Sequence, residues 1–259
     1  MKKYLLCAAL LFFFLLILDA NLSSAEPDNE ITISAAISLK NAFEEIAKIF
    51  EERHLWAKIR FNFGASGDLA RQIQGGAPVD VFASAAQKDM DEIDQKGFIT
   101  PGTRINFAEN SMVLVKPGMS RIRMESFEDL RKSEVKRIAI GNPKSVPAGR
   151  YAEEVLKWFK LWEVVREKLV FAEHVRQVLD YIARNEVDAA MVYSTDAMIR
   201  PKEVTIVMKA PAKSHQPVVY PIAIVRGSKN ESVARAFTAL VLCTEGKNLL
   251  NRYGFETVR

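Results

Sequence analysis

The sequence predicts an α/β fold, because short β-branched runs alternate with amphipathic helical patterns from about residue 31 to the end of the chain. Such alternation is typical of parallel strands joined by helices that cover both faces of a sheet. The chain has no internal repeat, no low-complexity segment and no linker rich in proline, glycine or serine. Any second domain must therefore be formed by segments that cross from one half of the fold to the other.

The expected elements follow one another in a regular order. Residues 31–38 (ITISAAIS) are β-branched and apolar, residues 39–54 repeat apolar side chains at helical spacing, and residues 58–66 (KIRFNFGAS) alternate as a strand does. The same patterns predict further strands at 79–85, 111–117, 137–143, 169–173, 187–198 (running into a turn), 204–209 and 218–227. They predict further helices at 67–76, near 87–97, at 126–133, 148–169 (with a possible break) and 174–186, and two helices within 230–254.

Residues 1–25 have the pattern of a secretory signal peptide. Two lysines precede an unbroken apolar stretch at 4–18, and small residues stand just before the cleavage site expected after Ala25. The apolar stretch is short for a membrane-spanning helix, which favours cleavage. We therefore expect a mature protein that lies outside the cytoplasm, in a periplasmic or extracytoplasmic location.

Composition excludes further classes of structure and partner. Cys7 lies inside the apolar stretch and leaves with the signal peptide, so the mature chain has Cys243 alone and no internal disulfide. Within the apolar pattern AFTALVLC, Cys243 is expected to be a small buried hydrophobe. The formal net charge of +4 comes from mixed charges without a basic block, so nothing indicates a nucleic-acid partner.

The motifs of common enzymes are missing. There is no G-x-S-x-G elbow and no phosphate loop, and the three histidines His54, His174 and His215 are scattered without metal-ligand spacing. His174 is expected to be a solvated residue at a helix start. We expect a binding protein without a cofactor, and a secreted hydrolase of small anionic esters remains the alternative from another class.

Five residues stand where predicted strands end and helices begin, and three of them carry a hydroxyl group. They are Ser38, Ser66 in GASGD, Ala148 in VPAGR, Val175 after LVFAEH, and Tyr193. In open α/β sheets ligands collect at the carboxyl ends of strands, where the unpaired N–H groups of helix starts also gather. Each residue alone has an ordinary alternative: a helix cap, a turn, or core packing. Their recurrence, without Lys or Arg inside the motifs, instead predicts a site of neutral donors for an oxyanion.

The ordered set of motifs resembles the periplasmic molybdate-binding proteins of ABC transporters, the ModA type. The segments that carry the resemblance are ITISAAISLKNAFEEIA, FNFGASGDLARQIQGGAPVDVFASA, IGNPKSVPAGRYAEEVL, AEHVRQVLDYIARNEVDAAMVYSTDA and the ending RYGF. The resemblance implies a two-lobed periplasmic binding protein fold of type II, with mixed sheets flanked by helices and the ligand in the cleft between lobes. The expected lobes are 26–108 plus 221–259, and 109–220.

The resemblance also implies which residues bind. Ser38, Ser66 and Tyr193 would give hydroxyl groups, and Ser38, Ser66, Ala148 and Val175 would give backbone N–H groups. Molybdenum or tungsten would be present only as the bound oxyanion, molybdate or tungstate. The protein would be a monomer that delivers this ligand to the membrane permease of an ABC importer, and a sulfate- or phosphate-binding protein of the same fold is the alternative.

The first strand reads SAAIS where the resembled family commonly has three alanines before the serine, and two residues of the second motif also depart from the family. Gly67 stands where a residue with a hydroxyl is common, and Asp68 brings a carboxylate close to the expected anion. Asp68 is best explained as an acid in the first turn of a helix, where it stabilises the dipole. If Asp68 instead pointed into the site, it would accept a proton from the ligand and favour phosphate.

Overall fold

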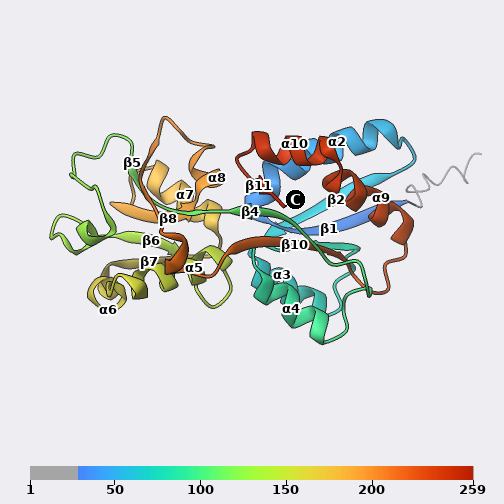
Figure 1. The fold of residues 1–259 in the computed structure, drawn as a ribbon, viewed down its shortest axis with the longest axis horizontal. Helices are drawn as coiled ribbons and strands as arrows, with labels where there is room; N and C mark the ends of the chain where they lie inside the picture. The colour runs from blue at the N-terminus through green and yellow to red at the C-terminus, as the bar shows by residue number, and fades with distance from the viewer. Residues whose placement is uncertain (1–28, 259) are drawn as a thin grey trace, which may run out of the picture.

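The computed structural model describes residues 29–258, so the predicted signal peptide, with Cys7, lies outside the described residues. Two sheets make up the fold, and each lies between helices (Figure 1). The first sheet contains β1 (Glu30–Ala36), β2 (Lys58–Gly64), β3 (Val81–Ala83), β4 (Ile105–Asn110), β10 (Val218–Ile224) and β11 (Glu256–Thr257). The second sheet contains β5 (Met112–Pro117), β6 (Ile138–Gly141), β7 (Leu169–Ala172), β8 (Ala189–Tyr193) and β9 (Val204–Lys209).

We call each sheet with its helices a half of the molecule. The helices of the first half are η2 (Ile37–Leu39), α2 (Lys40–Arg53), α3 (Ser66–Gln74), α4 (Gln87–Gln95), α9 (Glu231–Leu242) and α10 (Thr244–Arg252). The helices of the second half are η3 (Phe127–Arg131), α5 (Pro147–Trp158), α6 (Trp162–Val165), η4 (Arg166–Lys168), α7 (Val175–Ala183), α8 (Ser194–Ala197) and η5 (Ala212–Ser214). In Figure 1, α2, α9 and α10 lie on one side of the first sheet and α3 and α4 lie on the other.

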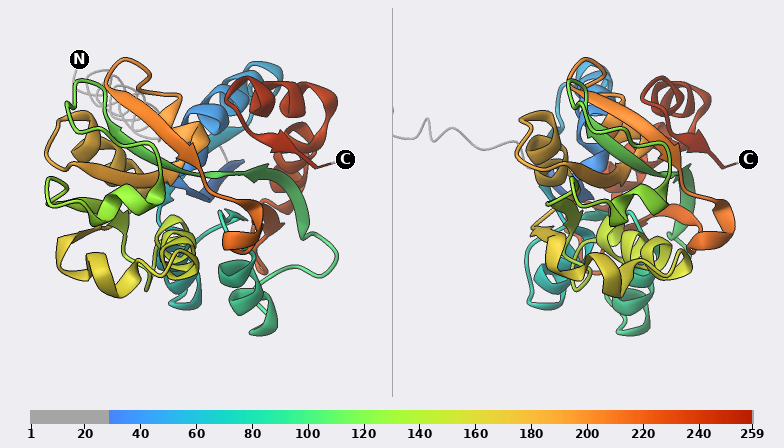
Figure 2. Two further views of the ribbon diagram at one scale, coloured as in Figure 1. Left: turned by 60° about the vertical axis from the view of Figure 1, so that its left-hand side comes forward. Right: turned by 90° about the vertical axis from the view of Figure 1, so that its left-hand side faces the viewer.

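Both sheets are mixed, with strand orders β11-β4-β10-β3-β1-β2 and β7-β6-β8-β5-β9. The expected parallel pairing holds for β2, β1 and β3 and for β7, β6 and β8, whose strands are joined by helices. The antiparallel strands lie where the chain crosses between halves. β4 leads into β5 with Ser111 alone between them, and β10 returns from the second half to the first (Figures 1 and 2). The carboxyl ends of the parallel strands in both halves therefore lead to helix starts beside this crossing.

The structure corrects several sequence-based expectations. β4 and β11 were not predicted, because β4 has few β-branched residues and no turn separates it from β5. The first strand ends at Ala36, so Ser38 lies in the 3₁₀ turn η2. Cys243 is exposed, not buried, because it is the junction residue between α9 and α10, where the apolar helical pattern has already ended.

No helix within residues 29–258 is long and apolar enough to span a bilayer.

Candidate functional site

All five residues predicted to bind an oxyanion line one small cavity between the two halves. From the first half, the cavity is lined by Ala36, Ile37, Ser38, Gly64, Ala65, Ser66 and Ala85. From the second half, it is lined by Val146, Pro147, Ala148, His174, Val175 and Tyr193. The wall residues other than the five carry no polar motif in the sequence, apart from His174, so only their position in the fold could have identified them.

Four of the five residues lie at helix starts. Ser66 begins α3, Ala148 is the second residue of α5, Val175 begins α7, and Ser38 lies in the 3₁₀ turn that leads into α2. Backbone N–H groups in the first turn of a helix have no acceptor within that helix. Within residues 29–258, the N–H groups of these four residues have no hydrogen-bond acceptor. The cavity therefore collects main-chain donors and the positive ends of helix dipoles.

The start of α5 is held against the end of β6 by two glycines. A Cβ on Gly149 would collide with the backbone carbonyl of Gly141, so only glycine allows α5 to begin this close to the strand. Pro147 occupies the first helical position, where its fixed φ suits the helix and its missing N–H is not needed. This packing explains why Ala148, which is fully buried, presents its backbone rather than a side chain to the cavity.

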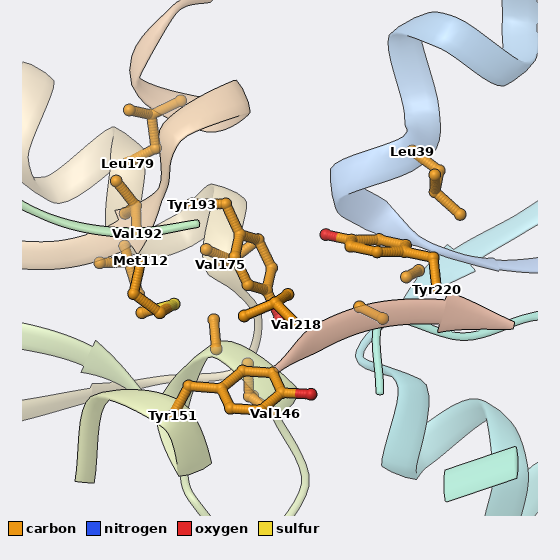
Figure 3. Packing of buried hydrophobic residues seen from close by; sticks show 14 of the residues in the cluster. Leu39, Met112, Val146, Tyr151, Val175, Leu179, Val192, Tyr193, Val218 and Tyr220 are labelled. Carbon is orange, nitrogen blue, oxygen red and sulfur yellow. The ribbon is translucent and has the colours of Figure 1, made fainter. Parts of the chain in front are cut away.

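Tyr193 brings a buried phenol into the cavity. Its side chain is 1% exposed, and its hydroxyl group has no hydrogen-bond partner among the described residues. Burial raises the pKa of Tyr193 well above its ordinary value, so the group remains a neutral O–H donor. Figure 3 shows Tyr193 and Tyr220 on opposite sides of the boundary between halves, and their ring centroids lie 6.0 Å apart. An unsatisfied buried hydroxyl costs roughly 1–3 kcal/mol, so it indicates a missing acceptor at this place.

The hydroxyl of each of the two serines has a hydrogen-bond partner within the protein. Ser66 Oγ accepts a hydrogen bond from the N–H of Ala85 at 2.9 Å, so the hydrogen of Ser66 is left to donate elsewhere. Ser38 Oγ lies 3.0 Å from the hydroxyl of Tyr220. Both serines are buried, at 4% exposure or less.

Each arginine near these helix starts is neutralised by an aspartate. Arg71 pairs with Asp68, Arg150 with Asp89, and Arg176 with Asp196 at 2.6 Å from Nε to Oδ1. Asp89 and Asp196 are buried, and burial raises the pKa of both carboxyl groups while the paired arginine opposes the shift. The arginines therefore bring no net charge to the surroundings of the cavity.

Asp68 and His174 differ in how they relate to the cavity. Asp68 does not line it, because its carboxylate pairs with Arg71 at the start of α3 and faces a separate surface pocket. His174 does line the cavity and is half-buried, which corrects the expectation of a solvated histidine. The physical reason is capping: His174 Nδ1 accepts a hydrogen bond from the N–H of Gln177 at 3.1 Å, which holds the ring at the start of α7.

The arrangement favours a fully ionised oxyanion. Among residues 29–258, the cavity lining contains no carboxylate and no Lys or Arg, and its polar groups include three hydroxyls and the open N–H groups of the helix starts. An oxyanion without protons can accept hydrogen bonds from all of these donors, whereas a protonated oxyanion would need an acceptor for its own hydrogen. The described residues also contain no cluster of three or more side chains of the metal-ligating types.

Residues 31–256 match the family model of the bacterial extracellular solute-binding proteins. The chain belongs to this family. Its relatives identify it further as a ModA-type periplasmic binding protein with a type II fold.

Three relatives show how much of the chain these similarities cover. A Bacillus subtilis protein named "Putative ABC transporter substrate-binding lipoprotein YvgL" is 39% identical over 98% of both chains. The molybdate-binding protein ModA of Escherichia coli is 37% identical over 88% of this chain and 89% of its own. The solved structure of the periplasmic molybdate-binding protein of Azotobacter vinelandii is 22% identical, covers 88% of this chain and all of its own, and superposes with a TM-score of 0.80. The last likeness shows the fold alone.

Proposed function

We propose that this protein captures molybdate, and tungstate with it, in the cavity formed by Ser38, Ser66, Ala148, Val175 and Tyr193. The observation that carries the proposal is the Tyr193 hydroxyl, a buried donor without a partner in the described part of the chain. It lines the same cavity as the four open N–H groups and the two serines. The names of the ModA relatives support molybdate as the ligand. The protein acts by binding and release, without catalysis.

The number of donors is sufficient for tight binding. Each hydrogen bond to a charged group contributes roughly 1.5–3 kcal/mol, so about seven donors give a gross ~10–20 kcal/mol before desolvation and closure are subtracted. A nanomolar dissociation constant requires about 12 kcal/mol, which lies within this range. Sulfate has the same charge on shorter bonds, so a rigid shell sized for the larger ion would leave gaps around it.

Closure of the two halves would secure the ligand. The halves are joined beside the cavity by the N–H of Gly67, which donates to the carbonyl of Ser145 at 3.1 Å, and by the largely buried ion pair Arg150–Asp89. Arg176 also reaches across, donating to Asn41 Oδ1 at 2.9 Å. We propose that these contacts define a closed form, which presents a different surface to a permease from that of an open form.

The rest of the proposal concerns location and partners. We propose one lobe at 26–108 plus 221–259 and another at 109–220, so that β4 and β10 each cross a lobe boundary. The protein would be secreted through its signal peptide, remain monomeric and deliver its ligand to the membrane permease of an ABC importer. The relation to ABC transporter substrate-binding proteins supports this role.

Isothermal titration calorimetry with molybdate, tungstate, sulfate and phosphate tests the proposal. We expect nanomolar-range binding of molybdate and tungstate, and at least a hundredfold weaker binding of sulfate. Equal affinity for sulfate and molybdate would contradict the proposed ligand.

Asp68→Asn tests the phosphate alternative. We expect it to leave molybdate affinity within about twofold, because Asp68 pairs with Arg71 outside the cavity. Phosphate binding at neutral pH that disappears in Asp68→Asn would instead identify a phosphate-binding protein.

A further inference from the structure

We propose that Asn110 and Tyr220, neither of which lines the cavity, are positioning residues that fix the Ser38 hydroxyl as a hydrogen-bond donor toward the ligand. This inference rests on the proposed function of the cavity. It assigns a specificity role to side chains on β4 and β10, the two strands beside the crossings between halves.

The orientation of the Asn110 amide is set by a group that can only donate. The backbone N–H of Ser111 lies 2.8 Å from Asn110 Oδ1, so this atom must be the oxygen. The hydroxyl of Ser194 donates to the same oxygen at 3.0 Å. Asn110 Nδ2 therefore points the other way, toward the hydroxyls of Thr195 at 2.9 Å and Tyr220 at 3.3 Å.

The orientation of the Asn110 amide fixes the direction in which the Tyr220 hydroxyl donates. Because Asn110 Nδ2 can only donate, the oxygen of Tyr220 accepts there. Its hydrogen is then directed to Ser38 Oγ, 3.0 Å away, which is its remaining hydrogen-bond partner in the described part of the chain. Tyr220 is fully buried, and burial raises the pKa of its hydroxyl, so the group keeps this hydrogen at neutral pH.

Ser38 is consequently left with one hydrogen to give, and it lines the cavity. A ligand O–H aimed at Ser38 would have to use the one lone pair that Tyr220 leaves free, and the hydrogen of Ser38 would then lose that ligand oxygen as its acceptor. A buried donor without an acceptor is unfavourable, so this arrangement is weaker than donation from Ser38 to an oxygen that carries no proton. The relay from Asn110 through Tyr220 therefore strengthens the preference for an oxyanion without protons.

The two serines of the cavity differ in how their direction is fixed. Ser66 receives a backbone N–H from Ala85, which a side-chain substitution does not remove. Ser38 receives a side-chain hydroxyl, which can be removed by a single oxygen deletion. The relay can therefore be tested without disturbing the backbone of the site.

A double-mutant cycle with molybdate tests the relay. Tyr220→Phe, Ser38→Ala and the double variant are compared with the wild type by calorimetry, and the ligand-free proteins are checked by thermal unfolding. We expect Tyr220→Phe to weaken binding about five- to tenfold and Ser38→Ala about tenfold or more. In the Ser38→Ala background, Tyr220→Phe should add less than about twofold, because Tyr220 acts through Ser38.

The matched control is Tyr253→Phe, which also deletes one phenolic oxygen. Tyr253 donates to Glu45 at 2.8 Å, away from the cavity, so its loss should leave affinity unchanged in both backgrounds. If Tyr220→Phe fails to fold, Asn110→Asp replaces the donor facing Tyr220 by an acceptor and keeps the bonds of Oδ1. The effects of Asn110→Asp and Ser38→Ala on the free energy of binding should then be non-additive in the double variant.

The outcomes separate the relay from the proposed function. A wild-type protein that does not bind molybdate would overturn the proposed function. The relay alone would be overturned if the wild type binds molybdate but Tyr220→Phe loses no affinity. It would also be overturned if the fold-losses of Tyr220→Phe and Ser38→Ala simply multiply in the double variant.

Discussion

Tyr193→Phe is the substitution that most directly separates a ligand donor from a structural hydroxyl. It deletes one oxygen that is buried and has no hydrogen-bond partner among the described residues, and it keeps the aromatic ring. A hydroxyl used for stability would have a partner within the protein. We therefore expect the substitution to weaken ligand binding without destabilising the ligand-free protein.

The expected magnitudes follow from the two states of the hydroxyl. Toward a buried dianion, one lost donor costs roughly 1.5–3 kcal/mol, which is about tenfold to over a hundredfold in the dissociation constant. In the ligand-free protein, the deletion removes a desolvation penalty where the halves are closed, and it costs little where the halves are open and water reaches the hydroxyl. The melting temperature should then stay constant or rise, by about 2–4 °C for each kcal/mol gained in a chain of this length.

Calorimetry with molybdate and thermal unfolding of the ligand-free protein provide the two measurements. Tyr253→Phe again serves as the control for loss of a phenolic oxygen, because its hydroxyl is bonded to Glu45 at the surface. The reasoning would be refuted if Tyr193→Phe bound molybdate within twofold of the wild type. A ligand-free melting temperature several degrees lower would also refute it, since the hydroxyl would then have an internal partner.

Three further predictions concern the backbone donors, the contact between halves and pH. Ala148→Pro removes the N–H at the start of α5 and should weaken molybdate binding at least tenfold, whereas Ala148→Gly should change the affinity by no more than a fewfold. A folded Ala148→Pro protein with wild-type affinity would contradict the role of this N–H. Gly67→Ala should weaken molybdate binding by about tenfold or more, because its Cβ would lie 2.6 Å from the carbonyl oxygen of Ser145, and small-angle scattering of the molybdate-saturated protein should shift toward a more open form. Unchanged affinity and shape would contradict the close approach of Gly67 to Ser145. Molybdate affinity should stay constant from pH 8 to 10.5, because burial raises the pKa of Tyr193 and so keeps its hydroxyl protonated and donating. A several-fold loss of affinity in calorimetry near pH 10, where an ordinary tyrosine ionises, would show that burial does not keep this hydroxyl protonated.

The sequence predicted most of the elements because local patterns determine them. The apolar spacing of α2 and the β-branched run of β1 place these elements within about two residues of their observed bounds. The short strand β4 was missed, because its pairing with β10 and β11 stabilises it more than its own composition does. Cys243 was misplaced because an apolar pattern does not show where one helix ends and the next begins.

The candidate site divides in the same way. Glycine, proline and serine at strand ends mark Ser38, Ser66 and Ala148 in the sequence, because the requirements of a helix start are local. The position of Asp68 outside the cavity was decided by its pairing with Arg71, which the sequence leaves open. The neutralisation of Arg150 by Asp89, 61 residues away, likewise depends on the approach of the two halves, since Asp89 lies on α4 and Arg150 on α5.

By itself, the sequence determined the α/β class, the helix starts that supply N–H donors, and the identity of the groups that could bind an oxyanion. These features depend on residue type and on spacing over a few positions. Only the tertiary structure decided that five separate strand ends meet at one cavity, that the Tyr193 hydroxyl lies there without a partner among residues 29–258, and that Tyr220 hydrogen-bonds to Ser38. The physical reason is that hydrogen-bond direction and burial depend on contacts between residues far apart in the sequence, such as Ser38 and Tyr220, 182 positions apart, which no local pattern records.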